Sequence, residues 1–370
     1  MWLSAHFLNK NEGNGESRPL LPPTYYKCNP AVSRDSLSLE HRQQQNAIKG
    51  EEKQMSRKTV MMHFFFTLVF FCFFYLFCCY TIPPNFDYDN INTIISFGDS
   101  YTTRYLDMNT LTYACRNCTS AGGPNWVVYL TDVNQWISWD FAYNSAPVSN
   151  SLVHQANTVI DVDMQVQELY PRLFVSPNKK TASIISDRYK NKQRNAESTL
   201  VTFWVGINDI DLTYGWDHTD RLDSHIMQQY TLLVEELIEK GERQFMLINV
   251  PPIDRAPLWQ NTTYEAQIQK RVLSFNNRIT QMINILRKKH RKALFFEYDA
   301  HQFFSVVLDH GSEYNITDID TFCPDWSHPI ERKCKPIDDY FWLNDLHPTY
   351  HVHSLLAQDM VKYLKQSSNK

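Results

Sequence analysis

Residues 94–102 of the chain read Ile94-Ile95-Ser96-Phe97-Gly98-Asp99-Ser100-Tyr101-Thr102. The run Thr93–Phe97 is apolar and rich in β-branched residues, which is typical of a buried strand. Because Gly98 permits a sharp turn, this strand is expected to carry Ser100 to the edge of a sheet. We also expect a helix to begin just after the turn and to aim its backbone N–H groups at the serine.

Four later runs have the same character and are separated by amphipathic segments. Leu222–Lys240 and Thr263–His290 carry apolar residues every three to four positions, which indicates helices, and Gly241 can cap the first of them. This alternation predicts an α/β/α sandwich, in which helices cover both faces of a parallel sheet. The later strands are expected at Trp139–Ala142, Leu200–Val205, Gln244–Val250 and Leu294–Tyr298.

Polar residues follow three of these strands directly. They are Ser100, the segment Asn144–Ala146, and Asn208 in Gly206-Ile207-Asn208-Asp209. The carboxyl ends of parallel strands meet at one edge of the sheet, where active sites of such folds lie. We therefore expect these three segments to converge.

A further motif, Asp345-Leu346-His347-Pro348-Thr349, lies near the C-terminus. A serine nucleophile needs a base that takes its proton and returns it to the leaving alcohol, and histidine does both near neutral pH. Ser100, Asn208 and His347, in this order and with these neighbours, indicate an ester hydrolase.

The motifs resemble the sequence blocks of the SGNH (GDSL) hydrolase superfamily, and within it the fungal acetylesterases of carbohydrate esterase family sixteen and the GDSL lipases and acylhydrolases. The resemblance spans roughly residues 91–365 and keeps the order of the family's blocks. It implies a flavodoxin-like α/β/α domain that cleaves esters with neither a metal nor an organic cofactor. The matching blocks are Phe97–Thr102, Gly122-Gly123-Pro124-Asn125-Trp126-Val127, Trp204–Asp209, Asn249–Arg255 and Trp342–Thr349.

By resemblance, the oxyanion hole consists of the Ser100 backbone N–H, the Ser145 backbone N–H and the Asn208 side-chain amide. Ser145 stands where the family normally has a glycine. Any residue except proline keeps the N–H, so the donor survives. A positive φ would cost Ser145 roughly 1 kcal/mol or more.

The third member of the triad is a second departure. The family pattern sets an aspartate three residues before the histidine, but here that position is Asn344, and Asp345 is one residue closer. Asparagine can hold the imidazole tautomer through its carbonyl oxygen but cannot stabilise imidazolium by charge. Either Asn344 orients His347 in a Ser-His dyad, or Asp345 reaches the ring by a local shift.

The N-terminal region is predicted to form three parts before the hydrolase domain at 91–370. Residues 1–58 are polar and are expected to be a disordered cytoplasmic tail. Residues 59–82 are expected to be a transmembrane signal anchor, because Phe64–Ile82 has no charged residue and would reach roughly 28 Å as a helix. Residues 83–90 are expected to be a linker.

The flanks of the apolar stretch predict its orientation. Lys53, Arg57 and Lys58 precede it, which places the N-terminus in the cytosol. The hydrolase domain would then lie in the lumen or outside the cell, as in a single-pass type II membrane protein of the secretory pathway or cell surface. The glycosylation sequons, at Asn117, Asn261 and Asn315, all follow the stretch.

Cysteine usage agrees with an oxidising compartment. Past the apolar stretch the sequence has Cys115, Cys118, Cys323 and Cys334. Four cysteines allow three pairings, of which the local ones, Cys115 with Cys118 and Cys323 with Cys334, are expected.

The formal net charge of −4 does not support binding to nucleic acid. Three functions stay open for the domain. One is release of acetyl groups from carbohydrate esters, another is a lipid esterase or lysophospholipase, and the third is an inactive, membrane-tethered carbohydrate-binding homologue. Trp126, Trp204 and Trp342 adjoin the motifs and would line a sugar cleft or pack in the core.

Overall fold

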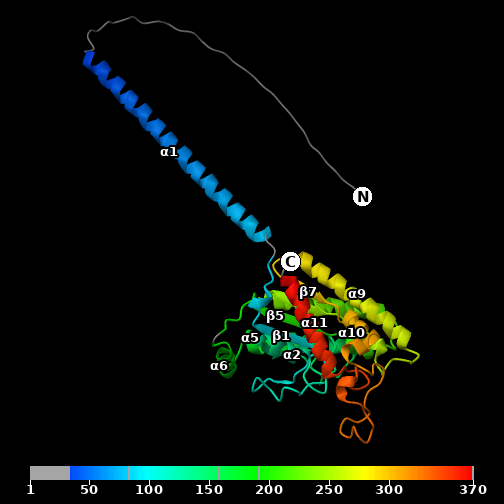
Figure 1. Cartoon of the computed structure of the whole chain (residues 1–370). Coiled ribbons are helices and arrows are strands. Elements are labelled where there is room, and N and C mark those ends of the chain that lie inside the picture. Colours follow the sequence, from blue (N-terminus) through cyan, green and yellow to red (C-terminus); the bar gives the residue numbers. More distant parts are fainter. Residues whose placement is uncertain (1–33, 82–83, 157, 191, 369–370) are drawn as a thin grey trace, which may run out of the picture. The chain divides into compact units, whose positions relative to one another are not determined.

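The computed structural model describes residues 34–81, 84–156, 158–190 and 192–368. It divides into two units, Met1–Thr81 and Ile82–Lys370, each of which is described by itself (Figure 1).

The first unit is the single helix α1 (Arg34–Thr81). Residues 34–58 are thus helical, whereas their polar composition predicted disorder. The physical reason is their content of Glu, Gln, Lys and Arg, which favour helix, and the absence of proline from this segment. Residues 1–33 of the expected tail lie outside the described residues. None of the helices in the described part of the chain combines the length and apolar character that a membrane crossing needs.

The second unit contains a five-stranded sheet in the order β4-β1-β5-β6-β7, with every neighbouring pair parallel. The predicted parallel sheet is confirmed, and all five expected strands are present with ends shifted by no more than two residues. This order is the flavodoxin-like one, with the switch of direction beside β1. The strands are β1 (Thr93–Gly98), β4 (Ile137–Asp140), β5 (Thr199–Trp204), β6 (Gln244–Ile248) and β7 (Leu294–Tyr298).

Helices form a layer on each face of the sheet. The connection from β1 to β4 runs in the opposite direction to the later connections, so right-handed crossovers place α2 (Trp126–Asn134) on one face and α8 (Thr219–Glu239) and α9 (Glu265–Lys289) on the other. The C-terminal helix α11 (Tyr350–Ser368) packs on α2 (Figure 1). On the other face, α8 packs on α9. Both helices expected from periodicity are present.

Shorter elements complete the domain. Cysteine pairing is as expected, with disulfides Cys115–Cys118 and Cys323–Cys334. The remaining strands are β2 (Leu106–Asp107) and β3 (Thr112–Tyr113), and the remaining α-helices are α3 (Asn150–Val153), α4 (Val162–Met164), α5 (Tyr170–Phe174), α6 (Lys179–Arg188), α7 (Ile207–Asp211) and α10 (Ala300–Asp309). A π-helical turn covers Gln165–Leu169, and 3-10 turns cover Tyr88–Asn90, Ile253–Arg255, Gly311–Tyr314 and Ile337–Asp339.

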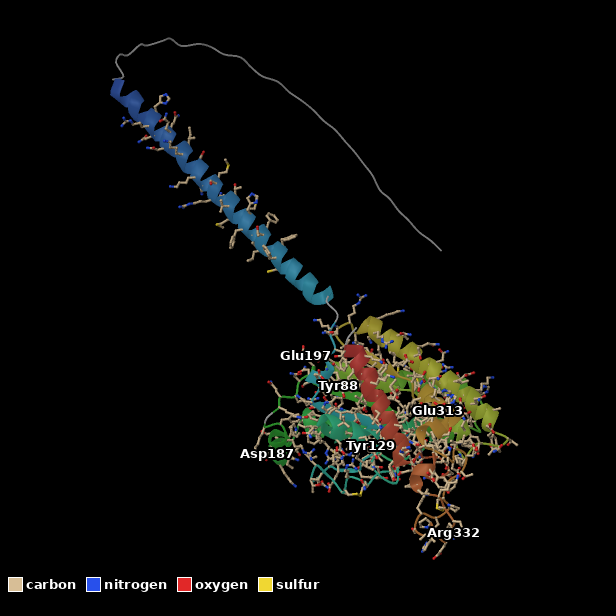
Figure 2. All side chains as sticks on the ribbon, in the orientation of Figure 1. Tyr88, Tyr129, Asp187, Glu197, Glu313 and Arg332 are labelled. Atoms are coloured by element: carbon tan, nitrogen blue, oxygen red, sulfur yellow. A yellow bond between two sulfur atoms is a disulfide. The ribbon has the colours of Figure 1, made fainter. Side chains whose placement is uncertain are left out.

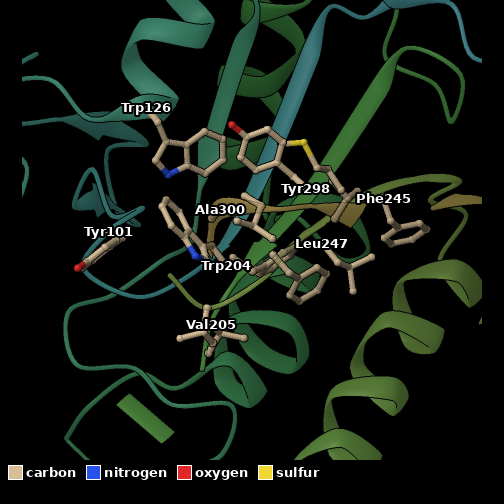
Figure 3. Close-up of a cluster of buried hydrophobic side chains, with 14 of the residues drawn as sticks. Tyr101, Trp126, Trp204, Val205, Phe245, Leu247, Tyr298 and Ala300 are labelled. Carbon is tan, nitrogen blue, oxygen red and sulfur yellow. The ribbon is translucent and has the colours of Figure 1, made fainter. Parts of the chain in front are cut away.

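The core lies between the sheet and both helical layers and is rich in aromatic side chains (Figure 3). Trp126, Trp204 and Trp342 are all buried in it. Their indole rings therefore do not line a cleft, and of the two roles considered for them, core packing holds.

Residues 84–90 differ from the expected linker. Phe86 and Tyr88 are buried in the core of the second unit. The Tyr88 backbone N–H donates to Ser368 Oγ at 2.8 Å, and its hydroxyl donates to Asn134 Oδ1. Figure 2 labels Tyr88 on the second unit. The domain thus begins near Phe86. Burial of the two large aromatic side chains stabilises this segment in its folded position by more than its loss of conformational entropy costs.

Candidate active site

The carboxyl ends of β4, β1 and β5 bring the predicted segments together. These three strands are neighbours in the sheet, and Ser145, Ser100 and Asn208 come shortly after their respective ends. The expected convergence follows from this strand order.

The turn that carries the nucleophile is held by its backbone. Gly98 has φ of 145°, and a Cβ there would collide with the backbone carbonyl oxygen of Trp204, so no other residue fits. The side chain of Gln165 pairs with both polar backbone groups of this glycine. It accepts from the Gly98 N–H at 2.9 Å and donates to the Gly98 carbonyl at 2.8 Å.

The expectation of a helix directly after Ser100 was wrong. No helix begins there; instead the N–H groups of Thr102 and Thr103 donate to the Asp99 carbonyl, forming a single turn. Asn125 closes this turn from outside, since its amide donates to the Thr102 and Thr103 carbonyls at 2.6 and 3.1 Å. Asn125 is also the N-cap of α2, so its side chain joins the turn to the helix.

The buried Asp99 carboxyl stabilises the turn that carries Ser100. Its Oδ1 accepts from the Tyr101 N–H at 3.0 Å. Burial raises the pKa of Asp99 to about 7, an increase opposed by the Tyr101 hydrogen bond. The Ser100 N–H has no acceptor among the described residues, which leaves this donor available to a ligand.

Ser100 and His347 are in direct contact. The Ser100 Oγ lies 2.7 Å from His347 Nε2, the distance of a strong hydrogen bond. Burial lowers the pKa of His347 to about 4, and the negative charge of Asp345 opposes this shift only in part. The ring is therefore neutral at pH 7 and can accept the hydroxyl proton.

The structure distinguishes Asn344 from Asp345 as the partner of the His347 ring. Asn344 Oδ1 lies 3.1 Å from His347 Nδ1, and it also accepts from the backbone N–H groups of Leu346 at 3.0 Å and His347 at 2.7 Å. An atom that accepts from two backbone donors must be the amide oxygen, so the proton of the ring is on Nδ1 and the lone pair on Nε2 faces Ser100. Asn344 thus selects the tautomer that a base requires.

Asp345 lies elsewhere in the same loop. Its side chain is exposed, and its carboxylate makes no hydrogen bond or ion pair with any described residue. The backbone carbonyl of Asp345 accepts from the Leu258 N–H at 2.8 Å. The local shift that would bring Asp345 to His347 is not present.

Tyr101 connects the histidine loop to the nucleophile turn. Its hydroxyl donates to the Leu346 carbonyl at 2.6 Å, and its ring centroid is 5.5 Å from that of His347. Since Tyr101 is buried directly after Ser100, it fixes the spacing between nucleophile and base.

The expected oxyanion donors surround the serine turn. Ser145 has φ of 61°, the left-handed conformation that a glycine would adopt without strain, and its N–H has no acceptor among the described residues. Asn208 Nδ2 donates to the Ala146 carbonyl at 3.2 Å and to Asp99 Oδ2 at 3.3 Å. These long bonds place the amide between the serine turn and the Ser145 loop.

A polar triangle braces the Ser145 loop. Asn144 Nδ2 donates to the Tyr105 hydroxyl at 2.6 Å, and Asn144 Oδ1 accepts from Ser120 Oγ at 3.0 Å. The third side joins Tyr105 and Ser120 at 3.3 Å.

Several positioning residues were not predicted from the sequence. Gln165, Tyr101 and Asn125 had no assigned role, although Tyr101 and Asn125 stand inside blocks that the resemblance covers. Gln165 follows a stretch without a motif, and a side chain that pairs with a distant backbone leaves no local pattern.

This combination of a flavodoxin-like sheet with a hydrogen-bonded serine and histidine at its carboxyl edge defines a carboxylic ester hydrolase of the SGNH type. The chain belongs to the GDSL-like lipase/acylhydrolase family, whose sequence model matches residues 94–360.

Two relatives found by sequence comparison are named acetylesterases. The acetylesterase of Thermothelomyces thermophilus is 25% identical over 292 residues, which cover 74% of this chain and 88% of that protein. The acetylesterase of Hypocrea jecorina is 20% identical over 329 residues, covering 76% of this chain and 91% of that protein. Among solved structures, the acetylxylan esterase Axe2 from Geobacillus stearothermophilus matches with a TM-score of 0.38 and 13% identity, covering 74% of this chain and 94% of that one.

Proposed function

We propose that this protein releases acetyl groups from carbohydrate esters by Ser-His catalysis. The observation that carries the proposal is the continuous chain of hydrogen bonds from Asn344 through His347 to Ser100. The names of two relatives, both acetylesterases, support the acetyl group as the acyl part.

In the first half of the reaction, Ser100 Oγ attacks the ester carbonyl while its proton moves to His347 Nε2. The carbonyl oxygen becomes an oxyanion and accepts from the Ser100 N–H, the Ser145 N–H and the Asn208 amide. An oxyanion is a stronger acceptor than a neutral carbonyl, so it competes well for the Asn208 N–H that now makes a long bond to Ala146. The protonated His347 then gives its proton to the departing sugar hydroxyl.

In the second half, water takes the place of the sugar. His347 removes a proton from the water, which attacks the acetyl group on Ser100, and the same three donors stabilise the second oxyanion. Acetate leaves, and the serine recovers its proton from the ring.

Asn344 makes this site differ from one with an aspartate. The amide oxygen orients the ring and selects its tautomer, but it adds no negative charge beside the imidazolium that forms in each half-reaction. Burial lowers the pKa of His347 to about 4, and Asn344 supplies no negative charge to oppose that shift.

The location of the enzyme is part of the same proposal. The uncharged stretch Phe64–Ile82 and the basic residues before it support a type II membrane anchor. The sequon residues Asn117, Asn261 and Asn315 are all exposed, as glycosylation requires. Glycosidase treatment should therefore lower the apparent mass of a membrane-bound form. A soluble product with three unmodified sequons from a eukaryotic host would contradict this location.

The deciding experiment compares substrates with the full-length protein and uses S100A as the control. Acetate release from acetylated xylo-oligosaccharides and from an aryl acetate should exceed fatty-acid release from lysophosphatidylcholine and from a long-chain aryl ester. Faster release of the fatty acid would instead establish a lipid esterase. Folded protein that hydrolyses none of these esters and still binds the oligosaccharides would establish the inactive binding homologue.

A further inference from the structure

A cavity of about 560 Å³ lies beside the edge strand β4, outside the cluster formed by Ser100, His347 and Asn208. Two arginines line it: Arg104, four residues after the nucleophile, and Arg188, at the end of α6. Ser138 of β4 and Tyr113 of β3 contribute further polar groups to its wall. The cavity is large enough for a single sugar ring or a phosphate group.

Neither arginine has a carboxylate partner. Among the ion pairs formed by the described residues, none includes Arg104 or Arg188. The acid that lines the cavity, Asp132, is already paired with Arg116 at 2.7 Å. Asp140 interacts electrostatically with Arg104, since burial raises the pKa of Asp140 and the positive charge of Arg104 opposes that rise, but no ion pair joins the two side chains.

Aromatic rings hold both guanidinium groups in place. Arg104 Cζ lies 4.0 Å from the ring centroid of Tyr113, and Arg188 Cζ lies 4.3 Å from that of Trp139. A guanidinium that stacks by its face can still present N–H groups at its edge to an acceptor, which suits recognition of an oxyanion. Arg188 Nη2 already donates to the Leu111 carbonyl, so this arginine would offer its remaining N–H groups. Burial and, to a smaller degree, the positive charge of Arg104 lower the pKa of Arg188, as expected for two cations held near each other.

Two buried donors in this region lack a partner. Arg104 Nε and Ser138 Oγ are both inaccessible to water and make no hydrogen bond within the described structure. Ser138 as a whole is 7% exposed. The Tyr113 hydroxyl cannot serve them, because it is engaged by the Ser138 carbonyl and the Asp140 N–H, each at 3.0 Å. Unpartnered buried donors beside two unpaired cations call for an acceptor-rich anion.

We propose that this cavity is a binding site for an oxyanion, either the carboxylate of a sugar acid or a phosphate group, held by Arg104, Arg188 and Ser138. A sugar acid would be a neighbouring unit of an acidic polysaccharide substrate, whereas free phosphate would be a separate small ligand. Both present the planar or tetrahedral oxygens that two guanidinium edges recognise.

The test measures binding to the full-length protein by calorimetry, so it does not depend on ester hydrolysis. The probes are glucuronate, inorganic phosphate and, as the neutral control, glucose. Saturable binding of glucuronate or phosphate at millimolar concentration, without binding of glucose, is expected. Tighter binding of glucuronate identifies a sugar acid as the ligand, and tighter binding of phosphate identifies the small anion. Absence of saturable binding of either anion to the wild-type protein would overturn the proposal.

Matched variants locate the site. R188Q should weaken binding of the anion at least tenfold, and R188K should weaken it less because it keeps the charge and loses the planar fork. R278Q removes an arginine of α9 that pairs with Asp220 in the opposite helical layer, and it should leave the affinity unchanged. Equal affinity in R188Q and R278Q would place the bound anion elsewhere and would also overturn the proposal.

Discussion

Replacement of Asn344 by aspartate tests the proposed role of this residue most directly. The amide oxygen accepts three N–H groups, whereas the amide nitrogen has no acceptor among the described residues. N344D therefore exchanges the unbonded NH₂ group for an oxygen of nearly equal size and breaks no hydrogen bond. The same three donors favour the ionised carboxylate, so the variant adds one negative charge next to His347.

The size of the effect follows from the distance. Asn344 Oδ1 is 3.1 Å from His347 Nδ1, and two unit charges about 4 Å apart interact by about 4 kcal/mol at an effective dielectric constant of about 20. At about 1.4 kcal/mol per pKa unit this is an upper limit of roughly three units, and measured shifts of this kind are about one to three units. The pKa of His347, about 4 in the native protein, should rise to between about 5 and 7 in N344D.

The assay is the pH dependence of kcat/KM on an aryl acetate. Because neutral His347 is the active base, a higher pKa moves the acidic limb of the profile upward. If the pKa rises to about 6, the neutral fraction at pH 5 falls from roughly 90% to roughly 10%, whereas activity at pH 8 is retained or increased. Matched control D345N should shift the limb little, and downward, since it removes a charge that raises the pKa of His347.

Two outcomes would refute this reasoning. A profile that is the same in N344D and in the wild type would mean that residue 344 does not face the ring during catalysis. A sharp loss of activity in D345N, with little change in N344D, would mean that Asp345 reaches the ring in the working enzyme.

Three further predictions concern the nucleophile, the oxyanion hole and the strained loop. S100A and H347A should each remove most activity, and the double variant should lose little more, because the two side chains act as one unit; multiplicative losses would contradict this. N208A should lower kcat on the order of a hundredfold with a smaller effect on KM, and an unchanged kcat would remove Asn208 from the mechanism. S145G should keep its activity, because the N–H remains, and should raise the free energy of unfolding by up to about 1 kcal/mol in urea denaturation, because glycine adopts a φ of 61° without strain. A lower free energy of unfolding in S145G would show that the Ser145 side chain stabilises the fold by more than its backbone strain destabilises it.

Much of the fold was predictable because its signals are local. The strand and the turn at Thr93–Ser100 follow from consecutive β-branched residues and one glycine, and the sheet follows from the alternation of such runs with amphipathic segments. The cost of a positive φ at Ser145 was considered from the family's glycine at that position, and the structure places Ser145 at φ of 61°. By contrast, burial of Phe86 and Tyr88 depends on partners hundreds of residues away, among them Ser368.

The sequence by itself indicated the class of the protein, the order of its strands along the chain and three candidate site residues, Ser100, Asn208 and His347. Only the tertiary structure showed that Asn344, and not Asp345, forms a hydrogen bond with the His347 ring, because the sequence does not say which of two adjacent side chains reaches a given partner. The same holds for Gln165, which meets Gly98 across the fold, and for Arg104 and Arg188, whose unpaired charges become adjacent only when α6 packs beside β4. Contacts between distant segments arise from packing, and packing leaves no local pattern in the sequence from which they could be predicted.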